Sequence, residues 1–256
     1  MCPGCKALAL ALRAKALTLD ECHDLLKAEH PGLSRATLHR FFAASGVSRL
    51  IPKRKDRGKK FKSYKPGYVH TDLFYLPAIG GKRRYCFVAI DRQTRLAFLK
   101  VYDSKTKKSA VDFIRRALEF FPFKVHRLMS DNGPEFTNRR YKRAPGGAKK
   151  VHALDALCNE HGIQRRYTKP YTPATNGMAE RFNGLCKQAT VSKFRYPDHA
   201  AVEAALAQWM RVYNLCRPHG SIGRLTPIQQ AMKGYNENKA LFRGDPMEHC
   251  GPFLTC

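Results

Sequence analysis

The chain has 256 residues, of which 43% are hydrophobic, a proportion ordinary for a globular protein with a buried core. Its 47 Lys and Arg residues against 20 Asp and Glu give a formal net charge of +27. Because this charge runs through segments that look folded, we expect a nucleic acid partner and no membrane partner. No stretch reaches the ~18 apolar residues of a membrane span. Nine Cys residues without a regular framework favour a reducing cytoplasm.

Residues 1–50 are predicted to form a small all-α helix-turn-helix domain. Thr18 and Glu21 have the spacing of a capping box, which starts a helix that runs to about residue 29. Ser34 caps a second helix over residues 35–44. The second helix would lie in the major groove of DNA, although many helical pairs of this kind serve only packing. Its outward-facing residues, expected to contact DNA, are Arg35, Thr37, His39 and Arg40.

Two features flank this domain. Cys2 and Cys5 have CxxC spacing, but no second pair follows at zinc-finger distance, so we expect a frayed terminus with two thiols. Residues 51–66 form a basic linker, which could be a solvated segment or could follow a DNA backbone. In the second case the DNA contacts include Lys53, Arg54 and Lys55.

From residue 67 the pattern predicts an α/β domain that extends to residue 233. Strands are expected at 68–76, 84–91, 96–102, 125–130 and 164–167. Helices are expected at 107–120, 151–161, 176–195 and 198–215. This order is typical of a ribonuclease H-like mixed five-stranded sheet flanked by helices. Residues 234–256 are expected to form an irregular tail.

Three carboxylates stand in this predicted domain where a structural acid would be poorly placed. Asp72 interrupts the first strand, Asp131 ends the fourth, and Glu180 opens a helix. If the first strand lies beside the fourth, all three side chains face one spot, where their repulsion would be relieved by two divalent cations. An all-oxygen ligand set suits Mg²⁺ or Mn²⁺. Taken singly, each acid has a plainer explanation: a strand-edge charge, a turn, or a favourable helix start.

Four sequence segments carry a resemblance to a known family. HTD at 70–72, SDNGPEF at 130–136, TNGMAERFN at 175–183 and YNLCRPH at 213–219, followed by LTP at 225–227, resemble the DDE catalytic core of bacterial insertion-sequence transposases related to retroviral integrases. The resemblance implies that Asp72, Asp131 and Glu180 are catalytic metal ligands. It further implies donor-DNA contacts at Lys169, Asn176 and Arg217, and we add Lys187 as an expected DNA contact.

Two departures from the family pattern concern DNA contacts. The chain has a basic stretch at residues 139–150, which could be an added DNA contact or only a loop. A single helix-turn-helix is visible, whereas many relatives carry another upstream, so a truncated copy is a possibility.

We therefore expect a transposase that cleaves DNA ends and transfers them to target DNA, as a homo-oligomer on the DNA. The resemblance also implies a bacterial cytoplasmic protein that associates with the nucleoid. One metal ion, held by Asp72 and Asp131, would polarise a water, and the other, held by Asp72 and Glu180, would stabilise the leaving 3′ oxygen. The alternatives are a truncated, non-catalytic protein that binds transposon ends as a repressor, and a structure-specific nuclease on the same fold.

Overall fold

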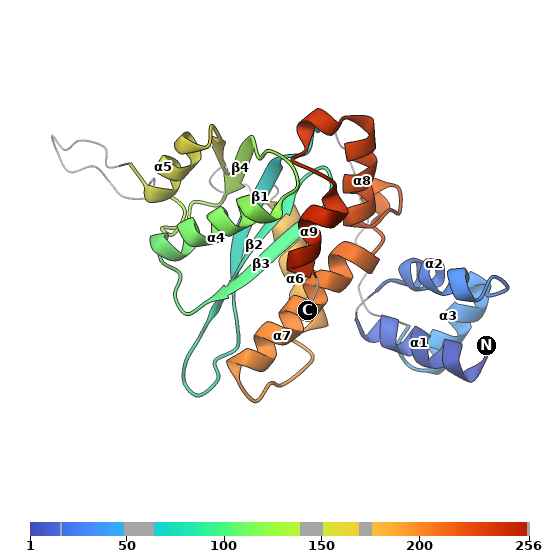
Figure 1. Cartoon of the computed structure of the whole chain (residues 1–256). Coiled ribbons are helices and arrows are strands. Elements are labelled where there is room, and N and C mark those ends of the chain that lie inside the picture. Colours follow the sequence, from blue (N-terminus) through green and yellow to red (C-terminus); the bar gives the residue numbers. More distant parts are fainter. Residues whose placement is uncertain (16, 49–63, 139–150, 169–175, 255–256) are drawn as a thin grey trace.

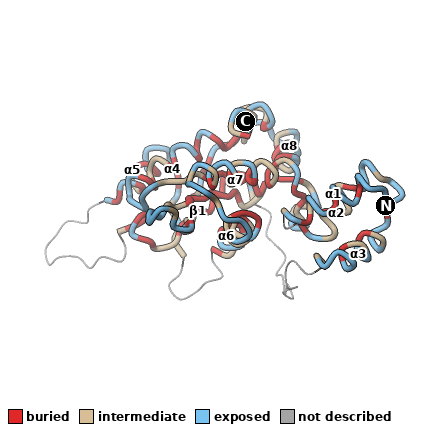
Figure 2. The backbone as a smooth tube through the Cα atoms, turned by 90° about the horizontal axis from the view of Figure 1, so that it is seen from below, coloured by how far each residue is buried: buried red, intermediate tan, exposed pale blue. Residues whose placement is uncertain are grey.

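The computed structural model describes residues 1–15, 17–48, 64–138, 151–168 and 176–254. These residues form a three-helix unit at the N-terminus and a larger unit built around a sheet (Figure 1). Each unit has its own buried hydrophobic cluster. In the larger unit, Figure 2 shows the buried residues along β1 and on the sides of the helices that face it.

The N-terminal unit consists of α1 (Pro3–Ala14), α2 (Leu19–Glu29) and α3 (Arg35–Ala44). The predicted capping box of Thr18 and the cap by Ser34 are both confirmed. The expected frayed terminus is wrong, because α1 begins at Pro3 with Cys2 as its N-cap, and Cys5 is buried. Proline is preferred at the first position of a helix, so Pro3 is a local sequence signal for the start of α1.

The larger unit contains one five-stranded sheet in the order β3-β2-β1-β4-β5. β1 pairs antiparallel with β2 and parallel with β4, β2 pairs antiparallel with β3, and β4 pairs parallel with β5. The predicted mixed five-stranded sheet and the placement of the first strand beside the fourth are thus confirmed. The strands are β1 (Tyr68–Tyr75), β2 (Tyr85–Asp91), β3 (Ala97–Tyr102), β4 (Arg127–Ser130) and β5 (Gln164–Tyr167).

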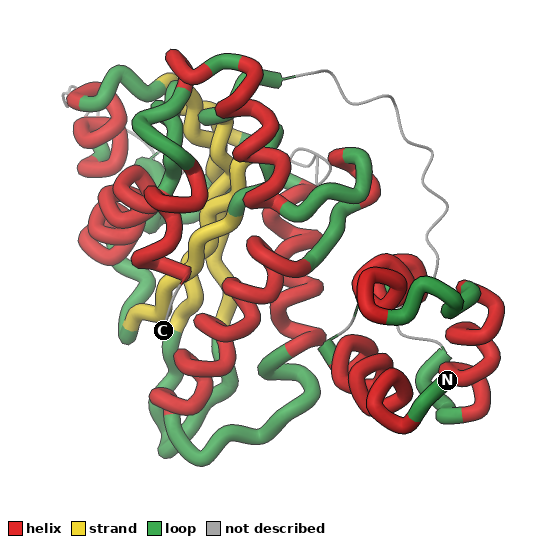
Figure 3. The backbone as a smooth tube through the Cα atoms, turned by 45° about the vertical axis from the view of Figure 1, so that its right-hand side comes forward, coloured by secondary structure: helices red, strands yellow, loops and turns green. Residues whose placement is uncertain are grey.

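Helices lie on both sides of this sheet (Figure 3). α4 (Lys107–Phe120) packs on β2 and β3, and α5 (Ala153–Glu160) packs on β5 and α4. α6 (Gly177–Ala189) packs on β1 and β2, and α7 (His199–Arg211) packs on β3 and α6. Burial on both sides explains why six of the seven β2 residues are buried, as the strand's burial pattern shows.

Two of the predicted helices have different ends in the structure. α6 stops at Ala189 and does not continue to residue 195, because Thr190 turns out of the helical conformation and its hydroxyl bonds to the Cys186 carbonyl. α7 continues beyond Arg211 as a turn of π-helix over Val212–Cys216.

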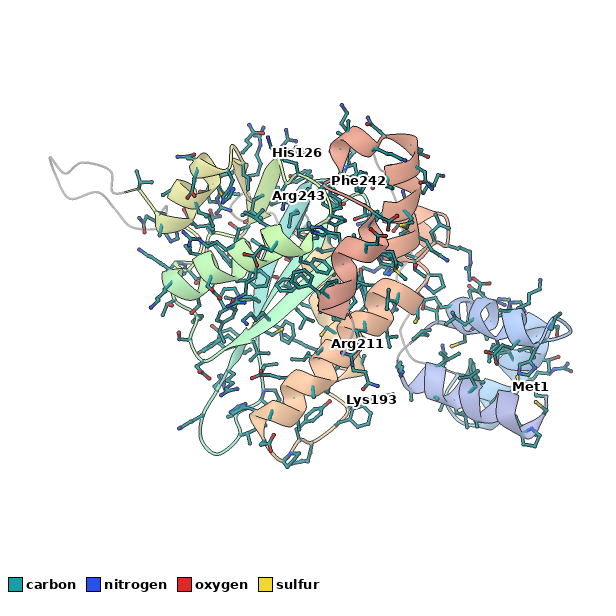
Figure 4. All side chains as sticks on the ribbon, viewed as in Figure 1. Met1, His126, Lys193, Arg211, Phe242 and Arg243 are labelled. Carbon is teal, nitrogen blue, oxygen red and sulfur yellow. The ribbon has the colours of Figure 1, made fainter. Side chains whose placement is uncertain are left out.

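The expected irregular tail is wrong over the described residues 234–254. α8 (Pro227–Glu237) runs across residue 233, and α9 (Pro246–Leu254) follows and packs against α8 and α4. Cys250 and Leu254 are buried in the main core. Arg243, labelled with Phe242 in Figure 4, donates to the Leu118 carbonyl. The Gly, Asn and Pro residues of this segment favoured an irregular tail in the sequence analysis. In the structure, tertiary packing against the core stabilises the helical conformation.

Candidate active site

Asp72 and Asp131 are brought side by side by the pairing of β1 with β4. The parallel register places His70 opposite Met129, and two further steps along both chains place Asp72 level with Asp131. Asp131 directly follows the last residue of β4, so its carboxylate stands at the edge of the sheet. α6 packs on β1 and carries the exposed Glu180 in its first turn. The structure therefore brings the three predicted acids to one region.

The carboxyl group of Asp72 is in an unfavourable place for a negative charge. Burial, together with the smaller effects of the Asp131 and Glu180 carboxylates, raises its pKa from 3.8 to about 7. A hydrogen bond from the Leu73 amide and the positive charge of Lys187 act in the opposite direction. A carboxyl group whose charged form is disfavoured both by burial and by two neighbouring carboxylates is typical of a functional site.

Asn183 is a site residue that the sequence analysis did not single out. Its side-chain amide donates to Asp72 Oδ2 at 2.9 Å, while the Leu73 amide donates to Oδ1 at 2.8 Å. Asn183 is only 7% exposed and lies three residues after Glu180, on the same side of α6. The spacing of three residues on a helix was the signal that could have found it.

The loop that carries Asp131 is shaped by short polar contacts. Asp131 Oδ1 accepts from the Gly133 amide at 2.9 Å, which makes an Asx turn. A Cβ at Gly133 would lie 2.7 Å from Glu135 Oε1 and 3.0 Å from Asp131 Oδ1, so a larger residue there would force the Glu135 carboxylate to move. Arg165, from β5, donates to the Ser130 hydroxyl and the Phe136 carbonyl on either side of the loop. Glu135 is thus a fourth acid near the predicted site.

The chemistry of these side chains suits a hard divalent cation, since all candidate donors are carboxylate or amide oxygens. A bound cation would also favour the charged form of Asp72, which burial disfavours. In the part of the chain that the structure describes, no three His, Cys, Asp or Glu side chains lie close enough together to coordinate a metal ion. The three acids therefore lie in one region but are not arranged as a complete coordination shell.

The predicted DNA-contact residues of the N-terminal unit lie on the outer side of α3. Arg35, His39 and Arg40 are exposed, and Thr37 is half-buried, with its amide donating to the cap Ser34. Arg35 also pairs with Asp20 of α2 at 2.5 Å. The predicted contacts Lys53, Arg54, Lys55 and Lys169 lie outside the described residues, as do the basic residues 139–150.

The remaining predicted contacts lie in or near the core. Lys187 holds its ammonium 5.2 Å from the Phe74 ring centre. Asn176 is 3% exposed and accepts a hydrogen bond from His70 Nδ1 at 3.3 Å, so it supports the start of α6 from inside. Arg217 is only 4% exposed and pairs with Glu21 of the N-terminal unit, so in this structure it is covered.

Comparison with known proteins agrees with this arrangement. Residues 62–173 match a family model described as an integrase core domain, and residues 161–227 match a second one of the same description. A protein of insertion element IS476 from Xanthomonas euvesicatoria is 27% identical over 82% of this chain, and the chain spans 58% of its length. A protein of insertion element IS407 from Burkholderia multivorans is 24% identical over 89% of this chain and 80% of its own.

The fold also matches a chain in the structure of a simian T-cell lymphotropic virus intasome, with a TM-score of 0.53 and 15% identity over 83% of this chain and 74% of that one. This likeness shows a shared fold and confirms the predicted ribonuclease H-like sheet. None of the helices in the described segments is long and apolar enough to cross a membrane. Residues 62–227 thus belong to the integrase core family, and the similarity to insertion-element proteins agrees with the predicted resemblance to insertion-sequence transposases that carry this core.

Proposed function

We propose that this protein cleaves the phosphodiester bond at the ends of a mobile DNA element and joins the freed 3′ hydroxyl to target DNA. The observation that carries the proposal is the group of three acids, in which partial burial and the charges of Asp131 and Glu180 raise the pKa of the half-buried Asp72. Carboxylates that repel one another can bind divalent cations between them. Bound cations then stabilise the negative charge on a transferring phosphoryl group. The net charge of +27 supplies a general attraction for DNA.

Asp72, Asp131 and Glu180 are the residues that would hold Mg²⁺ or Mn²⁺, as two ions. When bound, the ions would supply Lewis acid activation of a nucleophile and neutralise charge on the leaving oxygen. Asn183 would hold the Asp72 carboxylate in one orientation through its side-chain amide. Lys187, whose charge acts on Asp72, would attract a DNA phosphate to the same edge of the sheet.

Two DNA ends are joined to one target in such a reaction, so we propose that the protein acts as a homo-oligomer on DNA. The helix α3, with Arg35, His39 and Arg40 exposed, is the proposed reader of the end sequence.

The test compares three variants with a matched control on a labelled duplex that contains an end of the element. Asp72→Asn, Asp131→Asn and Glu180→Gln should each abolish Mn²⁺-dependent nicking and strand transfer while DNA affinity is retained or slightly raised. Asp103→Asn removes the same charge from an exposed acid that pairs with Arg84, and it should leave both reactions intact.

Retained strand transfer by Asp72→Asn would refute the assignment. Binding without any cut by the wild-type protein would favour an end-binding repressor, and cutting without joining would favour a structure-specific nuclease.

A further inference from the structure

The contact between the N-terminal unit and the core consists of basic side chains of the core and acceptors of the N-terminal unit. Arg217 pairs with Glu21, and Arg224 pairs with Asp24. Lys193, labelled in Figure 4, donates to the Ala14 carbonyl at 2.9 Å. Within residues 1–48 all the acidic residues lie on α2, and two of them are used in this contact. An acidic helix therefore covers arginines of a protein that has a large excess of positive charge.

Arg217 is the most deeply buried member of this contact, and it is poorly matched to its partner. Its Nε lies 3.3 Å from Glu21 Oε1, and its Nη2 donates to Oε2 at 3.4 Å. Charge-assisted bonds of this kind are normally about 2.7–2.9 Å long. Nη1 has no hydrogen-bond partner among the described residues, although it is buried. A buried guanidinium with unused donors is a site that a better anion can fill.

Further arginines stand near Arg217. The charges of Arg217, Arg95 and Arg181 all act on the half-buried His219, and burial with these charges lowers its pKa to about 3. The charges of the same three arginines and of Glu21 also act on the buried Tyr213, whose ring packs against His219. The charge of Asp91, the last residue of β2, also acts on Arg95 and favours its charged form. Because Arg181 follows Glu180 on α6, this cluster adjoins the candidate active site.

We propose that Arg217, with Arg95 and Arg181, forms a binding site for a backbone phosphate of DNA, and that Glu21 covers this site as a substitute for the phosphate. Phosphate offers oxygens in the geometry that a guanidinium fork binds best. DNA that reaches the core would then displace α2 and release the N-terminal unit to bind elsewhere on the duplex. This inference rests on the proposed function in that it takes DNA as the ligand.

Glu21→Gln is the variant that tests the site. Glu21 also accepts from the Thr18 amide as part of the capping box, and glutamine serves equally in a capping box, so α2 is kept while the charge is lost. Glu29→Gln is the matched control, since it makes the same change at an exposed position on the same helix. Thermal melts establish that each variant is folded.

The measurement is the affinity for a short duplex by fluorescence anisotropy, at 50 and 200 mM salt. Glu21→Gln should bind several-fold more tightly than Glu29→Gln at the lower salt. One added phosphate contact steepens the salt dependence by about 0.9 in log–log slope, so the gain should shrink about threefold at the higher salt. Adding Arg217→Gln to Glu21→Gln should remove the gain.

The outcomes separate this inference from the function on which it rests. Equal binding by Glu21→Gln and Glu29→Gln at both salts would show an ordinary ion pair and overturn the site, while DNA nicking by the wild type would leave the proposed function standing. If inorganic phosphate raises the melting temperature of Glu21→Gln above that in chloride of equal ionic strength, but DNA affinity does not rise, then the site binds free phosphate and our assignment to DNA is wrong. If no variant binds DNA, both proposals fail.

Discussion

Replacement of Asp72 by Asn should make the metal-free protein more stable at the same time as it removes activity. The pKa of the carboxyl group is 3.8 in an unfolded chain and about 7 in the folded protein. Each pKa unit corresponds to about 1.36 kcal/mol, so charging this group destabilises the fold by about 4 kcal/mol at most. The site is partly open to solvent, and about 2 kcal/mol is a sounder expectation.

The sign of the pH dependence follows from proton binding. Between pH 4 and 7 the folded protein holds a proton at Asp72 that the unfolded chain has lost, so the stability contributed by this group decreases as pH rises through that window. Asparagine is never charged, and its carbonyl can still accept from Asn183. At pH 8 the variant should therefore melt about 4–8 °C above the wild type, and at pH 4 the difference should vanish.

The assay is thermal unfolding followed by circular dichroism in buffer with a chelator, from pH 4 to 8. Asp112→Asn is the control of opposite sign. A hydrogen bond from the Tyr102 hydroxyl lowers the pKa of Asp112, so this variant should lose stability above pH 4. If Asp72→Asn melts below the wild type at pH 8, or differs from it equally at all pH values, Asp72 is a structural acid and our reasoning is refuted.

Three other predictions concern the site and the fold. Asn183→Leu, which removes the donor to Asp72, should slow single-turnover cleavage at least tenfold with unchanged DNA affinity, because a hydrogen bond to a charged group contributes about 1.5–3 kcal/mol; an equal loss of affinity would contradict this. Gly67→Ala should lower the free energy of unfolding by more than about 2 kcal/mol, measured by urea titration, because a Cβ there would lie 2.3 Å from a backbone carbonyl oxygen and the residue has a φ of +102°. Deletion of residues 246–256 should lower the melting temperature, since it removes the buried Leu254 and Cys250 from the core; an unchanged melt would show that α9 does not support the fold.

The sequence by itself determined the periodic elements and the positions of the acids. The apolar and aromatic runs of β1 and β2 and the caps at Thr18 and Ser34 are local signals, and local signals can be read without knowing the rest of the chain. Asp72 and Asp131 could be chosen because each interrupts or ends an apolar strand. Their proximity followed once the first strand was expected beside the fourth.

The tertiary structure alone decided which polar groups meet across long distances in the chain. Asn183 reaches Asp72 only because α6 packs on β1, and Arg165 braces the Asp131 loop only because β5 joins β4. Arg217 could be expected at DNA from its sequence context, but its burial beneath Glu21 depends on where the N-terminal unit docks. Helix α9 has weak local signals and is held by contacts with residues far away in sequence, and no local pattern contains that information.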